Sequence, residues 1–228
     1  MKTMYVRAAI FDFDYTLADS SEGAVECINF ALKEMALAEA SHESACRTIG
    51  LSLKDTFITL AGEAEAQRCD EFSRLFVRRA DEVMVGLTTL YESVPATIEE
   101  LRRQGLMLGI VSTKYRYRIE EILARSSLLH FFEVIVGGED VKQHKPDPEG
   151  LFEAIERLGC SPASVVYAGD SVADAEVSRR ASVPFIAVLS GVTERECFDS
   201  YEAIAVLDNL SQLPALLSSL SPEHDGPL

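Results

Sequence analysis

Two aspartates stand two residues apart where an apolar segment ends. Residues 6–11 form this segment and are typical of a buried strand in a parallel sheet, and Asp12 and Asp14 follow it. Aspartate is depleted in strands, and a buried carboxylate needs a compensating partner. A divalent cation, a lysine or water could supply that compensation. The alternative is a polar turn with both carboxylates solvated, and this fragment alone leaves both interpretations open.

Polar side chains also follow three of the other apolar segments that predict core strands. Ligands of an open parallel sheet bind outside the carboxyl ends of its strands, so we expect these side chains at one rim. Singly, each has a structural explanation: a helix cap, a surface lysine or a turn residue. Unrelated structural roles would not be expected to place all of these side chains at one edge of the sheet. The set is Asp12, Asp14, Ser112, Thr113, Lys145, Asp170 and Asp174.

Such a rim is suited to phosphoryl transfer onto a carboxylate. Carboxylate oxygens hold Mg²⁺, and the metal and an ammonium group neutralise charge on the phosphoryl oxygens. One aspartate can attack phosphorus to form an aspartyl phosphate. A second aspartate can protonate the leaving oxygen and later deprotonate water.

The hydrophobic pattern predicts an α/β fold: a doubly wound parallel sheet with a small all-helical insert. Residues 20–87 contain only apolar spacing typical of helices, and strand and helix patterns alternate after residue 88. We therefore expect a core domain (1–17 and 88–215), a helical cap (18–87) and a C-terminal tail (216–228). The expected strands are 6–11, 107–111, 134–136, 165–168 and 185–189, and the expected core helices are 95–104, 117–125, 149–158 and 173–180.

The composition limits the partners. The 228 residues carry a formal net charge of −16, which argues against nucleic acid, because phosphate neutralisation requires a basic face. The five cysteines are scattered without a C-x-x-C pair and predict neither a disulfide framework nor a zinc site. The first strand begins too early for a signal peptide, and no apolar run has membrane-spanning length. We expect a cytoplasmic protein without a membrane partner.

Four motifs in order resemble those of the haloacid dehalogenase-like (HAD) hydrolase superfamily, in its phosphoglycolate phosphatase-like branch with a helical cap. D-x-D-x-T corresponds to 12–16, the second motif to Ser112, the third to Lys145 before Pro146, and G-D-x-x-x-D to 169–174. The similarity covers nearly the whole chain. It implies an Mg²⁺-dependent phosphatase that acts on a small phosphorylated metabolite, either phosphoglycolate-like or a sugar phosphate.

The resemblance also implies a role for each motif residue. Asp12 would be the nucleophile and a metal ligand. Asp14 would be the general acid/base and would ligate Mg²⁺ through its backbone carbonyl. The remaining assignments are Asp170 as the second carboxylate ligand, Ser112 and Lys145 on the phosphoryl group, Asp174 holding a metal-bound water or orienting Lys145, and Thr16 and Thr113 in support.

Two positions depart from the family pattern. Tyr15 stands where this branch commonly has glycine, and Ala181-Ser182 where glycine commonly follows the alanine. The first places a phenol near the cap hinge, and the second is interpreted as a tolerated change at a helix end.

The sequence does not name the substrate. The cap is expected to shape the leaving-group pocket through Arg47, Gly50, Leu51 and Lys54, although Arg47 and Lys54 could equally be solvated helix residues. The basic and aromatic run 114–118 could bind an anion, but the start of a helix is the favoured interpretation.

Three other functions share part of this residue pattern. A dehalogenase needs neither Asp14 nor Asp170, so these residues favour phosphate. A phosphosugar mutase similar to β-phosphoglucomutase would use the same residues as a phosphatase. A receiver-like phosphoacceptor has similar acidic residues but no use for the helical insert.

Overall fold

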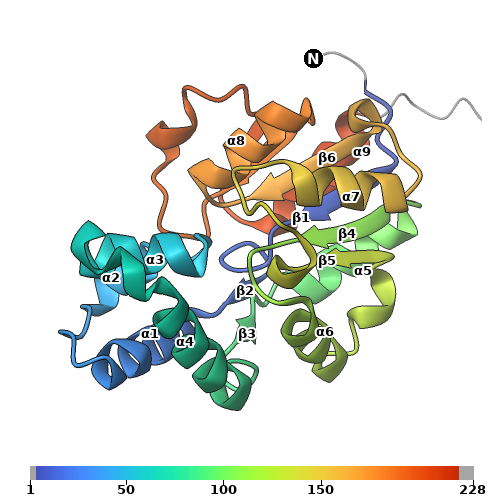
Figure 1. The fold of residues 1–228 in the computed structure, drawn as a ribbon. Helices are drawn as coiled ribbons and strands as arrows, with labels where there is room; N and C mark the ends of the chain where they lie inside the picture. The colour runs from blue at the N-terminus through green and yellow to red at the C-terminus, as the bar shows by residue number, and fades with distance from the viewer. Residues whose placement is uncertain (1–3, 221–228) are drawn as a thin grey trace, which may run out of the picture.

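The computed structural model describes residues 4–220 and contains an open parallel sheet with helices on both faces (Figure 1). Within this range six strands pair in the order β5-β4-β1-β6-β7-β8, all in parallel. This confirms the predicted doubly wound α/β fold. The strands are β1 Ala8–Phe11, β4 Met107–Val111, β5 Val134–Val136, β6 Val165–Gly169, β7 Phe185–Val188 and β8 Ala205–Leu207.

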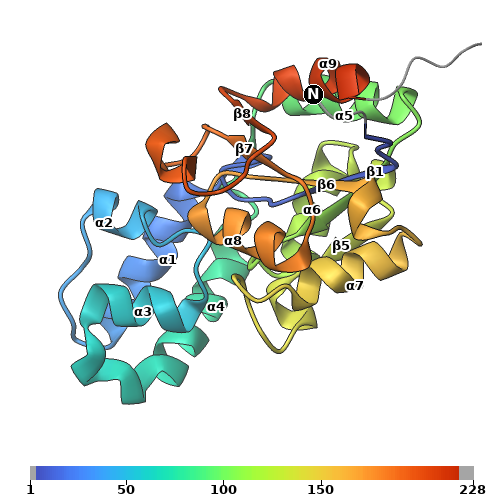
Figure 2. The same ribbon diagram turned by 90° about the horizontal axis from the view of Figure 1, so that it is seen from above.

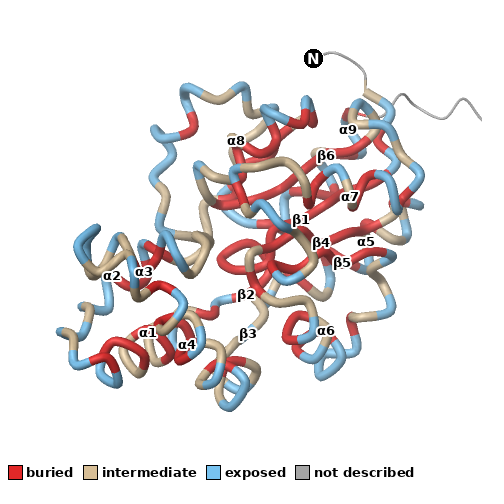
Figure 3. The backbone as a smooth tube through the Cα atoms, in the orientation of Figure 1, coloured by how far each residue is buried: buried red, intermediate tan, exposed pale blue. Residues whose placement is uncertain are grey.

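The helices cover the sheet in two layers (Figure 2). One apolar cluster joins the sheet to α5 (Val94–Arg103), α6 (Arg116–Arg125) and α9 (Leu213–Leu220). A second cluster joins the opposite face to α7 (Glu149–Arg157) and α8 (Val172–Ala181). Every residue of β1 is therefore buried, as the sequence Ala-Ala-Ile-Phe requires, and Figure 3 shows the central strands as one buried region.

The segment after β1 forms a helical layer with its own core. Its helices are α1 (Ser21–Glu34), α2 (His42–Cys46), α3 (Leu53–Ala61) and α4 (Cys69–Val83). Their apolar faces meet each other, and the rings of Phe57 and Phe72 stack with centroids 4.8 Å apart. Ser41 and Ser52 cap α2 and α3 by accepting hydrogen bonds from backbone N–H groups.

Four elements differ from the sequence-based expectation. The antiparallel pair β2 (Ala18–Asp19) and β3 (Thr89–Leu90) lies where the chain enters and leaves the helical segment. The edge strand β8 was also not predicted. The predicted tail boundary at 216 is wrong, because α9 continues to Leu220 and buries Leu217 and Leu220 in the core. Residues 221–228 of that tail lie outside the described part of the chain.

Short 3-10 helices complete the described structure, at Glu63–Arg68, Leu129–Phe131, Gly138–Asp140, Pro162–Ser164, Arg195–Phe198 and Leu210–Gln212. Between residues 4 and 220, no helix combines the length and apolar character needed to cross a membrane.

Candidate active site

Three carboxylates converge at the carboxyl ends of β1 and β6. Asp12 follows β1, Asp170 follows β6, and Asp174 lies in the first turn of α8. One carboxylate oxygen from each lies within 4.8 Å of the others, and all three residues are buried. Burial, together with the neighbouring Asp174 and Asp14, raises the pKa of Asp12 to about 6 despite the opposing effect of Lys145. Burial and the same kind of repulsion raise the pKa of Asp170 well above its usual value.

Lys145 provides part of the positive charge needed to balance these three carboxylates. Its Nζ lies 2.8 Å from Asp12 Oδ1 and 2.6 Å from Asp174 Oδ1. Burial alone would lower the pKa of Lys145, but these two carboxylates raise it well above its usual value. Sequence reasoning missed Tyr167, whose hydroxyl accepts a hydrogen bond from Lys145 Nζ at 3.1 Å and lies 2.9 Å from Asp174 Oδ1. A phenol within a fully buried strand was the available signal, because such a group needs a polar partner.

Asp14 lies outside this acidic cluster and has different partners. Lys114 Nζ forms an ion pair with Asp14 Oδ1 at 3.0 Å, and Ser20 Oγ donates a hydrogen bond to the same oxygen. Both side chains of the ion pair are more than nine-tenths buried. Neither partner was predicted for Asp14. The two carboxylates of the first motif are therefore held apart, Asp12 by Lys145 and Asp14 by Lys114.

The remaining predicted residues surround the rim. Thr16 Oγ1 donates a hydrogen bond to Asp170 Oδ1 at 3.4 Å. Ser112 is buried directly after β4, and its Oγ accepts a hydrogen bond from the backbone N–H of Lys114. Thr113 Oγ1 donates to the carbonyl of Gly50, which joins the core to the helical layer.

Two glycines allow the acidic residues to approach the backbone. A Cβ atom on Gly191 would lie 2.0 Å from Asp170 Oδ2, and one on Gly169 would lie 2.5 Å from Asp174 Cγ. Any side chain at either position would displace a carboxylate of the cluster.

The donor set fits a hard divalent cation. Lys145 is an ion-pair neighbour of Asp12 Oδ1, but no donor among residues 4–220 reaches this buried oxygen with hydrogen-bond geometry. Asp174 is more fully occupied, since Lys145, Tyr167 and both the N–H and hydroxyl of Ser171 contact it. Asp12 and Asp170 are therefore the carboxylates best placed to hold a hard divalent cation, which prefers oxygen donors.

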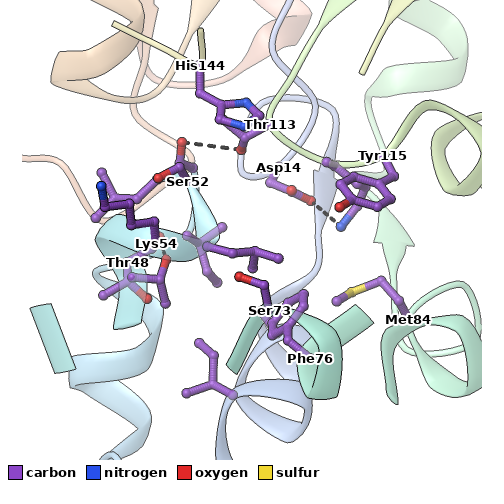
Figure 4. A pocket seen from close by; sticks show the side chains of 18 of the residues that line it. Asp14, Thr48, Ser52, Lys54, Ser73, Phe76, Met84, Thr113, Tyr115 and His144 are labelled. Atoms are coloured by element: carbon purple, nitrogen blue, oxygen red, sulfur yellow. Dashed lines mark hydrogen bonds and ion pairs between the residues drawn. The ribbon is translucent and has the colours of Figure 1, made fainter. Parts of the chain in front are cut away.

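A cavity of about 370 Å³ opens between the rim and the helical layer (Figure 4). Asp14, Thr113 and Lys114 line it from the core, and Gly50, Leu51 and Lys54 line it from the loop before α3 and the start of that helix. Arg47 does not line it. Its guanidinium pairs with Glu43 at 2.7 Å and its side chain is 70% exposed, which favours the solvated-helix alternative, and contact of Arg47 with substrate stays a prediction.

A family model for haloacid dehalogenase-like hydrolases matches residues 9–188. The chain belongs to this family. It is 31% identical over 208 residues to a Bacillus velezensis protein named pyrophosphatase PpaX. The aligned residues make up 91% of this chain and 94% of that protein. The chain also resembles the crystal structure of a haloacid dehalogenase-like hydrolase from Bacteroides fragilis, with 40% sequence identity and a TM-score of 0.88. The superposition covers 91% of this chain and 99% of the Bacteroides fragilis chain.

A third relative supports the fold alone. The crystal structure of a Haemophilus somnus protein described as a predicted phosphoglycolate phosphatase has 23% sequence identity to this chain and a TM-score of 0.80. The superposition covers 92% of this chain and 97% of the Haemophilus somnus chain. These comparisons confirm the HAD resemblance.

Both departures from the HAD motif pattern occupy left-handed backbone positions. Tyr15 has φ of 59° and Ser182, the C-cap of α8, has φ of 56°. Glycine adopts this region without a steric cost, which explains why the family commonly has it there. The buried ring of Tyr15 extends to Cys46 of α2, and burial followed by this contact raises the pKa of its hydroxyl far above the usual value.

The run 114–118 does more than begin a helix. α6 starts at Arg116, as the favoured interpretation requires, but Lys114 reaches Asp14 and Arg118 reaches the helical layer. Arg118 is almost fully buried and pairs with Asp81 of α4 at 2.6 Å, and Tyr117 also hydrogen-bonds Asp81. This run therefore joins the HAD core to its cap.

Proposed function

We propose that this HAD hydrolase is a Mg²⁺-dependent phosphatase of small phosphomonoesters that forms an aspartyl phosphate on Asp12. The separation of the two motif carboxylates carries this proposal. Asp12 lies in the acidic cluster beside Lys145, whereas Asp14 lines the cavity and is not part of that cluster. One carboxylate is thus positioned to attack phosphorus and the other to exchange protons with the leaving group.

Asp12 would attack phosphorus through a carboxylate oxygen, and the bond from phosphorus to the leaving oxygen would break. Lys145 and Ser112 would bind the phosphoryl oxygens, and Thr16 would hold Asp170 in place. The carboxylates of Asp12 and Asp170 and the backbone carbonyl of Asp14 would hold the magnesium ion. When bound, this ion supplies charge neutralisation for the phosphoryl oxygens.

Asp14 would donate its proton to the departing alkoxide and then take a proton from the water that opens the aspartyl phosphate. Lys114 and Ser20 both engage Oδ1, which leaves Oδ2 for the leaving group and water. Asp174 would orient Lys145, in agreement with its short contact to Nζ.

A second candidate substrate is inorganic pyrophosphate, because the Bacillus velezensis relative is named a pyrophosphatase. The same residues would act on it, with phosphate in place of the alcohol as the leaving group.

Steady-state release of phosphate from p-nitrophenyl phosphate and from a panel of phosphorylated metabolites tests the proposal. We expect repeated turnover with Mg²⁺, loss of activity with excess chelator, and recovery when Mg²⁺ is restored. Undiminished turnover in chelator would contradict the metal requirement. A single phosphorylation without turnover would indicate a phosphoacceptor, and an isomerised sugar phosphate without free phosphate would indicate a mutase.

A further inference from the structure

We infer that the cavity selects phosphomonoesters of alcohols with an apolar body and discriminates against inorganic pyrophosphate. This inference rests on the proposed phosphatase function and concerns the group that leaves. Asp14 places the cavity on the leaving-group side of the rim, since it is the carboxylate that lines the cavity and lies outside the acidic cluster.

The size of the cavity exceeds what a leaving phosphate needs. Its volume is about 370 Å³, whereas one water occupies roughly 30 Å³ in the liquid and a phosphate replaces only a few waters. Cavities above about 300 Å³ are typical of sites for organic ligands. Pyrophosphate would therefore leave most of this space filled with water.

Apolar side chains form part of the cap side of the cavity. Phe76 of α4 and Met84 directly after α4 belong to this apolar part (Figure 4), as do Ile28 of α1 and Leu51 from the loop before α3. Uncharged hydroxyl groups lie beside them, on Thr48, Ser52, Thr56 and Ser73. The apolar part of this wall favours a hydrocarbon or ring, because removing apolar surface from water stabilises the bound state. The hydroxyl groups on the same side are uncharged, so they offer a second phosphate hydrogen bonds without neutralising its charge.

The buried cations at the cavity already have anionic partners. Lys114 is paired with Asp14, and Arg118 is paired with Asp81 and also donates to the carbonyl of Val77. Of the lysines and arginines that line the cavity within residues 4–220, only Lys54, an exposed residue, has no ion pair. A leaving phosphate carries its charge into this cavity, and a buried charge without a partner is unfavourable.

His144 supplies one polar group at the core side. Its ring points from the loop before Lys145 toward the cavity (Figure 4), and its Nδ1 is buried without a hydrogen-bond partner among the described residues. This nitrogen is enclosed by protein atoms, whereas the hydroxyl-bearing Ser73 of α4 lines the cavity and would pair with one hydroxyl or carbonyl on the alcohol (Figure 4). The site thus fits an alcohol with an apolar body and a polar substituent.

The test compares benzyl phosphate, methyl phosphate and inorganic pyrophosphate on the wild-type protein with Mg²⁺. Benzyl and methyl phosphates both release alkanols, so they differ mainly in the apolar body. We expect kcat/KM for benzyl phosphate to exceed that for methyl phosphate by about 10- to 100-fold, the effect of burying one aromatic ring. We expect pyrophosphate to be hydrolysed no faster than methyl phosphate, although phosphate is the better leaving group.

Equal or faster hydrolysis of pyrophosphate than of benzyl phosphate would overturn the inference and leave the phosphatase function intact. Absence of turnover on all three and on p-nitrophenyl phosphate would instead overturn the proposed function.

A substitution tests the charge argument. Leu51→Lys adds a cation to the wall in a loop where the side chain is only partly buried, so the fold should tolerate it. The ratio of kcat/KM for pyrophosphate to that for benzyl phosphate should rise at least tenfold. Ile204→Lys, which adds the same charge at an exposed apolar residue away from the cavity, should leave the ratio unchanged. An unchanged ratio in folded Leu51→Lys protein would contradict the inference.

Discussion

Replacement of Asp14 by asparagine separates the two halves of its proposed work. p-Nitrophenyl phosphate has a good leaving group that departs without a proton, so Asp14→Asn protein should still be phosphorylated on Asp12. Opening of the aspartyl phosphate still needs a base for water. This step should slow by about 10²- to 10⁴-fold, the usual contribution of general acid–base catalysis.

The contacts of Asp14 determine how much the Asp14→Asn substitution lowers the free energy of unfolding. Asp14 Oδ1 accepts from Ser20 and pairs with Lys114 at 3.0 Å, and both ion-pair side chains are buried. The amide of asparagine keeps the shape and still offers an oxygen to these donors, but the charge-assisted contact is lost. We expect a loss of about 1–3 kcal/mol in the free energy of unfolding, which leaves a domain of ordinary stability folded.

Rapid-quench kinetics provide the assay. Asp14→Asn should release about one nitrophenol per active site in a burst, followed by slow turnover, with phosphoenzyme present throughout. Ser20→Ala is the matched control, because it removes one donor to Oδ1 but keeps the carboxylate; it should show neither the burst nor the large rate loss. Turnover of Asp14→Asn at the wild-type rate, or its complete failure to form phosphoenzyme while still binding metal, would refute the division of roles.

Two further changes test the surroundings of the site. Gly191→Ala should displace Asp170, because the added Cβ would meet Oδ2, and the Mg²⁺ concentration for half-maximal activity should rise at least tenfold; an unchanged metal requirement would argue against Asp170 as a ligand. Asp81→Asn should lower the free energy of unfolding by about 1 kcal/mol at neutral pH, measured by urea denaturation, because Asp81 is half exposed and its partner Arg118 is buried. Burial alone would raise the pKa of Asp81, but hydrogen bonds from Tyr117 and Arg118 lower it, so its stabilisation is present above about pH 4 and is lost as pH falls toward the lower folded-state pKa. A difference between wild type and Asp81→Asn that does not shrink below pH 4 would contradict this pairing.

The sequence was sufficient for the central strands because they are buried on both faces. The apolar residues of β4 and β5 coincide with the predicted ranges, and β1 is shorter by two residues. The misses are short elements whose stability comes from tertiary packing. β8 has three residues at the sheet edge, and α9 contains Pro214 and two serines, so neither has a strong local pattern.

The site residues were predictable where the backbone alone determines their positions. Asp12 and Asp170 had to meet because β1 and β6 are neighbours in the sheet. Lys114, Ser20 and Tyr167 could not be assigned in the same way, because their roles depend on the direction of each side chain. The same holds for Arg47, whose side chain pairs with Glu43 one helical turn away and does not line the cavity.

The most direct test of the central claim locates the phosphoryl group. Wild-type protein is quenched with acid during turnover of p-nitrophenyl phosphate, then treated with borohydride, which reduces an aspartyl phosphate to homoserine, and its peptides are mapped by mass spectrometry. Covalent catalysis by Asp12 predicts homoserine at position 12 and none in Asp12→Asn protein. Homoserine at position 14, 170 or 174, or none at all during sustained turnover, would contradict it.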